Sequence, residues 1–155
     1  MSGEAYELSV TCFIAAPRDV VWTVWTQRTA EWFSPAPWKT EMIAQDLRAG
    51  GRTALRMTGP NGEDTGPLEG VILEVVPNER IVTTDAWRVG WVPQKPFMTT
   101  IWSFADEGEG TRYNATVRHW DAEAKASHEA MGFHPGWDIV AAQFKALCEE
   151  SVGRD

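Results

Sequence analysis

The chain has 155 residues and a formal net charge of −8, with 14 Lys and Arg against 22 Asp and Glu. This length suits one domain with a sizeable core, and we expect residues 1–155 to form a single domain. The acidic balance argues against nucleic acid as a partner, because phosphate binding needs clustered cations. We find no secretory leader pattern and no apolar run near the ~20 residues that span a bilayer, so we expect a cytoplasmic protein without a membrane partner.

Cysteine and tryptophan are the informative residue types. Cys12 and Cys148 lack the spacing of a zinc site or a disulfide framework, and their apolar neighbours indicate small core residues. Nine tryptophans are many for this length, because each buried indole N–H needs a partner. They indicate either a tryptophan-rich core or the aromatic wall of a ligand cavity.

The first part of the chain predicts one strand followed by two short helices. Residues 6–15 alternate apolar and polar side chains, which is the period of a strand. Pro17 suits the start of a helix over 18–25, and a further helical turn over 29–33 ends at Pro35 and Pro37.

The middle of the chain predicts six more strands in consecutive hairpins, which is typical of an antiparallel sheet. Turn signals separate them, among them the Asn61-Gly62 pair. We place these strands at residues 38–46, 52–58, 66–76, 80–87, 97–105 and 111–120 and a loop at 90–96.

The C-terminal part predicts helices. Asp121 is a suitable N-cap for a helix from Ala122, and Gly132, Pro135 and Gly136 predict a kink or break. After the break an apolar stripe recurs every three or four residues, with Asp138, Gln143, Lys145 and Glu149 on the other face. The stripe consists of Trp137, Val140, Ala141, Phe144, Leu147 and Cys148. The whole order predicts an α+β helix-grip fold, in which a curved seven-stranded sheet surrounds a long C-terminal helix.

Several short motifs, in this order, carry a resemblance to a known family. They are Ala16-Pro17 with Val21-Trp22, Glu31-Trp32-Phe33, 46–52, 59–62, Gly70 with 74–81, Gly110-Thr111-Arg112, Met131-Gly132-Phe133 and Gly136-Trp137. With them the chain resembles bacterial homologues of the activator of the heat-shock protein 90 ATPase (the Aha-type domain), within the START-like (SRPBCC) superfamily of polyketide cyclases and lipid-transfer domains. The resemblance implies the helix-grip fold and a cavity between sheet and helix. It covers only the activator's C-terminal domain, which weakens a chaperone-binding role.

A ligand site is therefore expected in that cavity. Trp87, Trp102, Trp120 and Trp137 are candidate wall residues, with core packing as the alternative for each. The other candidates are mouth residues Trp32, Phe33 and Phe133, the adaptable Met98 and Met131, and Ala141 on the helix.

Catalytic candidates are fewer. The first is His119, which ends a strand near the expected cavity mouth. The second is Arg56, which can anchor a ligand only if its face of the strand lines the cavity. The third is Asp138 on the C-terminal helix. His128 and His134 are six residues apart, which does not suit a metal site on one helix face, so we expect neither metal nor cofactor.

Three functions follow as alternatives. We expect a non-catalytic protein that binds a small apolar or aromatic molecule, with a cyclase- or hydrolase-type enzyme second and a chaperone-binding module third. The sequence does not fix the oligomeric state, and a homodimer stays open.

Overall fold

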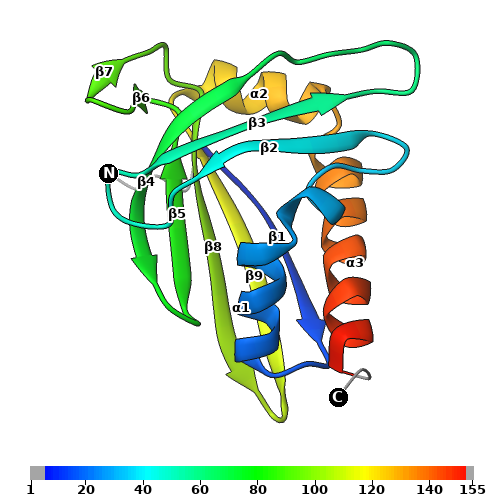
Figure 1. Cartoon of the computed structure of the whole chain (residues 1–155). Helices are drawn as coiled ribbons and strands as arrows, with labels where there is room; N and C mark the ends of the chain where they lie inside the picture. The colour runs from blue at the N-terminus through cyan, green and yellow to red at the C-terminus, as the bar shows by residue number, and fades with distance from the viewer. Residues whose placement is uncertain (1–5, 153–155) are drawn as a thin grey trace.

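The computed structural model describes residues 6–152 as a curved antiparallel sheet around a long C-terminal helix (Figure 1). The sheet has seven strands in the order β1-β9-β8-β5-β4-β3-β2. They are β1 (Glu7–Ile14), β2 (Lys39–Gln45), β3 (Arg52–Thr58), β4 (Leu68–Val76), β5 (Arg80–Thr84), β8 (Met98–Glu107) and β9 (Gly110–His119). The predicted α+β helix-grip fold is confirmed.

The first strand of the chain pairs with the last. The β1–β9 register runs from Glu7 opposite Arg118 to Ile14 opposite Thr111. Because β1 and β2 then form the two edges of the sheet, the chain between them crosses its concave face. This crossing contains the two predicted short helices, α1 (Arg18–Gln27) and the 3-10 turn η2 (Thr29–Glu31).

The core lies between α1, the C-terminal helix α3 (Phe133–Val152) and the inner face of β5, β8 and β9. The predicted stripe on α3 is confirmed, since Val140, Ala141, Phe144 and Leu147 all pack in this cluster. On the sheet side the cluster includes Ile81, Trp102, Phe104, Tyr113 and Ala115. Burial of these side chains removes apolar surface from water and fixes α3 on the sheet.

Gly70 allows β4 and β5 to approach closely. A Cβ atom there would lie 2.5 Å from the backbone oxygen of Thr84, well inside van der Waals contact. Any other residue would push the two strands apart.

The strand predicted over 80–87 ends earlier, at Thr84. The carboxylate of Asp85 accepts hydrogen bonds from the backbone N–H groups of Phe97 (2.8 Å) and Met98 (3.2 Å). These bonds close the base of an excursion that carries a separate two-stranded sheet, β6 (Trp87–Arg88) with β7 (Val92–Pro93). Trp87 therefore leaves the main sheet, and part of the loop predicted at 90–96 is a strand.

The predicted break in the C-terminal region separates α2 (Ala122–Ala130) from α3. The carboxylate of Asp121 caps α2 by accepting from the N–H of Ala124 at 2.8 Å. The break lies at Gly132, which has a φ of 92°. Pro135 and Gly136 lie within the first turn of α3, where a proline is tolerated because its missing N–H has no partner there. Among residues 6–152, no helix is long and apolar enough to cross a membrane.

Candidate functional site

A cavity of about 730 Å³ lies between the inner face of the sheet and the helices. Strands β2 to β5 and β8 border it, together with the segment around η2, part of α2 and the first half of α3. Its volume falls within the ~300–1,000 Å³ of small-molecule sites in proteins. The second half of α3 packs in the core, so the same helix closes the core and borders the cavity.

Most of the predicted ligand-contacting residues line this cavity. They are Trp32, Phe33, Met98, Trp102, Met131, Phe133 and Trp137. The indole of Trp137 stacks on the ring of Phe133, with centroids 5.0 Å apart. The cavity is thus bordered by aromatic rings and methionines, which offer a large and adaptable apolar surface.

Three of the predicted residues lie elsewhere. Trp87 belongs to the β6–β7 excursion and is 38% exposed, while Trp120 follows β9 and is 67% exposed. Ala141 is buried in the core cluster. The two tryptophans lie beyond the strands of the main sheet. Ala141 directly follows Val140, the last residue of α3 that lines the cavity, but its own side chain packs in the core.

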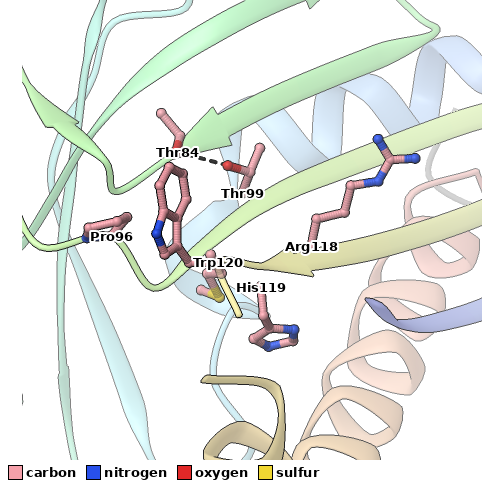
Figure 2. A pocket seen from close by; sticks show the side chains of 7 residues that line it. Thr84, Pro96, Thr99, Arg118, His119 and Trp120 are labelled. Atoms are coloured by element: carbon pink, nitrogen blue, oxygen red, sulfur yellow. Dashed lines mark hydrogen bonds between the residues drawn. The ribbon is translucent and has the colours of Figure 1, made fainter. Parts of the chain in front are cut away.

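Trp120 instead covers a smaller hollow of about 260 Å³ (Figure 2). Thr84 and Thr99 also line this hollow, and their hydroxyl oxygens are 2.9 Å apart. His119 also lines it, and Thr84 and Met98 border both hollows. The small hollow and the main cavity therefore meet at the end of β5 and the start of β8.

Arg56 and Asp138 do not line the cavity. Thr53, Leu55 and Met57 of β3 face it, so the alternating Arg56 lies on the outer face. There its guanidinium donates to both carboxylate oxygens of Asp64, at 2.8 and 2.7 Å. This pairing holds the pKa of Asp64 down at about 2. Asp138 is exposed on α3.

His119, the third catalytic candidate, is 5% exposed and forms a pair with His128 of α2. Its Nδ1 lies 2.8 Å from the backbone oxygen of Tyr6, and its Nε2 lies 2.8 Å from Nδ1 of His128. His128 lines the cavity, whereas His119 lies behind it. Burial, and then the neighbouring His119, lower the pKa of His128 to about 4, so His128 is neutral at physiological pH.

Other polar groups around the cavity already have partners within the protein. The side chain of Gln94 donates to the backbone oxygens of Glu69 (2.7 Å) and Asp85 (2.9 Å). Gln45 donates to the hydroxyl of Thr29 at 3.2 Å. These bonds fix the border without using a ligand.

Two buried donors on the helical side lack a partner in the part of the chain that the structure describes. They are the Nε1 atoms of Trp25 and Trp32, whose rings both border the cavity. An unsatisfied buried donor costs about 1–3 kcal/mol. Folded proteins contain few unpaired polar groups of this kind, so each one calls for an explanation, such as a functional role or an ordered water.

Part of the site, provided by β2, β3 and the β3–β4 connection, was not predicted from the sequence. It consists mainly of Met42, Thr53, Leu55, Met57, Pro67 and Leu68. The alternation along β3 contained the signal, because it set Leu55 and Met57 opposite the charged Arg56. His128 was considered only as a metal ligand. Residues 6–152 contain no group of three or more His, Cys, Asp or Glu side chains that could hold a metal ion.

The sequence has a clear family match. The model described as Activator of Hsp90 ATPase homolog 1-like protein matches residues 15–149. No curated protein matches the chain.

Solved structures agree with this match. A protein from Nitrosomonas europaea is 31% identical, with a TM-score of 0.90 over 96% of this chain and 97% of its own. A protein from Mycobacterium smegmatis is 25% identical, with a TM-score of 0.79 and coverages of 94% and 92%. An AHSA1-like protein from Aeromonas hydrophila, at 21% identity and a TM-score of 0.69, covers 96% of this chain and 95% of its own and shows the same fold.

Proposed function

This chain belongs to the Activator of Hsp90 ATPase homolog 1-like family, and we propose that it binds a small, mostly apolar or aromatic molecule between the sheet and α3. The observation that supports this most directly is the cavity of about 730 Å³ with aromatic rings and methionines around it. A well-packed core leaves few voids larger than a water molecule, so a space of this size in a 155-residue chain needs a reason. Its volume and apolar border suit a ligand of two or three rings.

The enzyme alternative has less support. Arg56 is engaged with Asp64 on the outer face of the sheet, and Asp138 is exposed on α3. His119 is separated from the cavity by His128. None of the three catalytic candidates therefore reaches a molecule in the cavity directly.

Gly136 offers a way to test the proposal. It borders the cavity in the first turns of α3, and a Cβ atom added there meets no heavy atom within 4 Å. Glycine inside a helix costs about 1 kcal/mol relative to alanine, so a larger residue should not destabilise the fold. Gly136→Phe therefore fills the cavity from the helix side. Ala142→Phe adds the same ring to the exposed face of α3 and serves as the matched control.

The experiment is a calorimetric titration with 2-methoxynaphthalene, supported by quenching of tryptophan emission. At roughly 0.3–0.6 kcal/mol per heavy atom, this probe should bind with micromolar to millimolar affinity. We expect binding to the wild type and to Ala142→Phe, and at least tenfold weaker binding to Gly136→Phe. Equal affinity in all three proteins would show that the probe binds elsewhere and would contradict the proposal.

A further inference from the structure

The pairing of His119 with His128 fixes which nitrogen of each ring carries a proton. A backbone oxygen only accepts hydrogen bonds, so Nδ1 of His119 must donate to the oxygen of Tyr6. In a neutral His119, Nε2 is then a bare acceptor. The contact of 2.8 Å between this nitrogen and Nδ1 of His128 requires a proton on His128 Nδ1.

The consequence is that Nε2 of a neutral His128 carries a lone pair and no proton. No residue between 6 and 152 hydrogen-bonds this nitrogen, while the ring itself lines the cavity. Threonine hydroxyls on the cavity border can rotate to donate or accept, but this imidazole nitrogen can only accept. The two hydrogen bonds from Tyr6 through His119 to His128 thus leave His128 Nε2 as a hydrogen-bond acceptor at the cavity.

Aromatic rings hold His128 in this orientation. The rings of Phe97, Phe133 and Trp137 lie with centroids 5.3, 5.0 and 6.2 Å from its own. The apolar surroundings disfavour the imidazolium ion, in keeping with the lowered pKa of this side chain. The ring therefore stays neutral and keeps its acceptor.

The charges around the cavity disfavour an anionic ligand. Glu69 and Asp85 both border it, and Glu69 is paired with Arg52. Among the described residues on the border, Lys95 alone carries a permanent positive charge, and it is exposed. A carboxylate near His128 would face a lone pair, with few cations to offset its desolvation.

We propose that His128 selects the ligand of this cavity, its Nε2 accepting a hydrogen bond from a hydroxyl or N–H group on an otherwise apolar molecule. Neutral phenols, alcohols and amines that keep an N–H are then preferred over carboxylates of the same size. The inference rests on the proposed binding function and names the class of ligand. His119 is a positioning residue, because it acts only by fixing the tautomer of His128.

The test compares three probes of one size, namely 2-naphthol, 2-methoxynaphthalene and 2-naphthoate, by calorimetry at pH 7.5. Only 2-naphthol is a neutral donor. His128→Phe keeps an aromatic ring but removes the acceptor. We expect the affinity ratio of 2-naphthol to 2-methoxynaphthalene to be about two- to tenfold larger in the wild type than in His128→Phe, the value of one hydrogen bond. Comparing ratios between proteins cancels the probes' own difference in hydration. We also expect 2-naphthoate to bind the wild type more weakly than 2-naphthol.

A second measurement needs no variant. The ¹⁵N chemical shifts of the imidazole nitrogens report the tautomer of each histidine, and we expect His128 with its proton on Nδ1. A proton on Nε2, or a probe ratio unchanged in His128→Phe, would overturn the inference. Suppose that 2-methoxynaphthalene binds the wild type and that Gly136→Phe blocks this binding, but that the affinity ratio of the two neutral probes is the same in the wild type and in His128→Phe. Then only the inference fails. If neither neutral probe binds the wild type, the proposed function and the inference fail together.

Discussion

The ring of Phe144 on α3 lies 4.5 Å, centroid to centroid, from the indole of Trp32 in the segment after η2. A second ring, that of Tyr113 on β9, lies 5.0 Å from Phe144 on the sheet side. Phe144 is fully buried between them, so it joins three separate parts of the chain. Trp32 also borders the cavity, which means that the ligand site and the core share an aromatic residue.

This position predicts a large loss of stability on truncation. Phe144→Ala removes a fully buried ring and leaves a cavity, and it should lower the free energy of unfolding by about 3–5 kcal/mol. Urea denaturation checks the value. Ile139→Ala, at a position of α3 that is 45% exposed, is the matched control and should cost far less. A loss below about 1 kcal/mol for Phe144→Ala would show that α3 is not held by this contact.

Gln143 is expected to hold the segment after η2 against α3. Its side chain donates to the backbone oxygens of Trp32 (3.2 Å) and Ser34 (2.9 Å) and accepts from the N–H of Ala36 at 2.9 Å. The sequence had set Gln143 on the polar face of the helix, and the structure gives it these three backbone partners. Gln143→Leu should lower the free energy of unfolding by about 1–3 kcal/mol. Hydrogen exchange at residues 32–36 should also become faster, and unchanged exchange would argue against the role.

Both cysteines should be poor nucleophiles in the folded protein. Burial raises the pKa of Cys148 to about 12 and also raises the pKa of Cys12. Because the thiolate is the reactive form, Cys148 should not react with a thiol reagent at pH 8 until urea unfolds the chain. Peptide mass spectrometry after labelling identifies the cysteine that has reacted. Rapid labelling of Cys148 in the native protein would contradict this prediction.

The strands and helices could be predicted from the sequence because their periodicity is local. The strand over 52–58 and the apolar stripe on α3 were both predicted from such local patterns, and both are confirmed. The end of β5 could not be predicted in this way. The strand-like sequence pattern shows no interruption between Asp85 and Trp87, so it gives no sign of an end at Thr84. The strand stops there because the Asp85 carboxylate accepts hydrogen bonds from the N–H groups of Phe97 and Met98.

The polar part of the site also could not be predicted from the sequence. His119 and His128 meet because α2 turns back against the end of β9. The two histidines are nine residues apart and belong to a strand end and a helix, so no periodic sequence pattern indicates that they are in contact. The aromatic border was easier to predict, because it follows from where each aromatic residue stands along its predicted strand or helix. Seven of the ten predicted ligand-contacting residues line the cavity.

The neutral His128 makes the stability of the protein depend on pH. Its pKa is about 4 when folded, against an ordinary value of about 6.5 in the unfolded chain. The unfolded chain therefore binds more protons between these two values. The stabilisation is fully present above pH 6.5 and is lost progressively as the pH falls toward 4.

This linkage can be measured between pH 7 and pH 5, before most carboxylates titrate. We expect the wild type to lose about 1 kcal/mol over this interval, a value reduced from the full linkage because His128 is only half-buried. His128→Phe keeps an aromatic ring among Phe97, Phe133 and Trp137 but cannot take up the proton, so its urea midpoint should change less. His134→Phe, at an exposed position, should behave like the wild type. Parallel losses in the wild type and His128→Phe would mean that another group takes up the proton and that His128 is not held neutral by its surroundings.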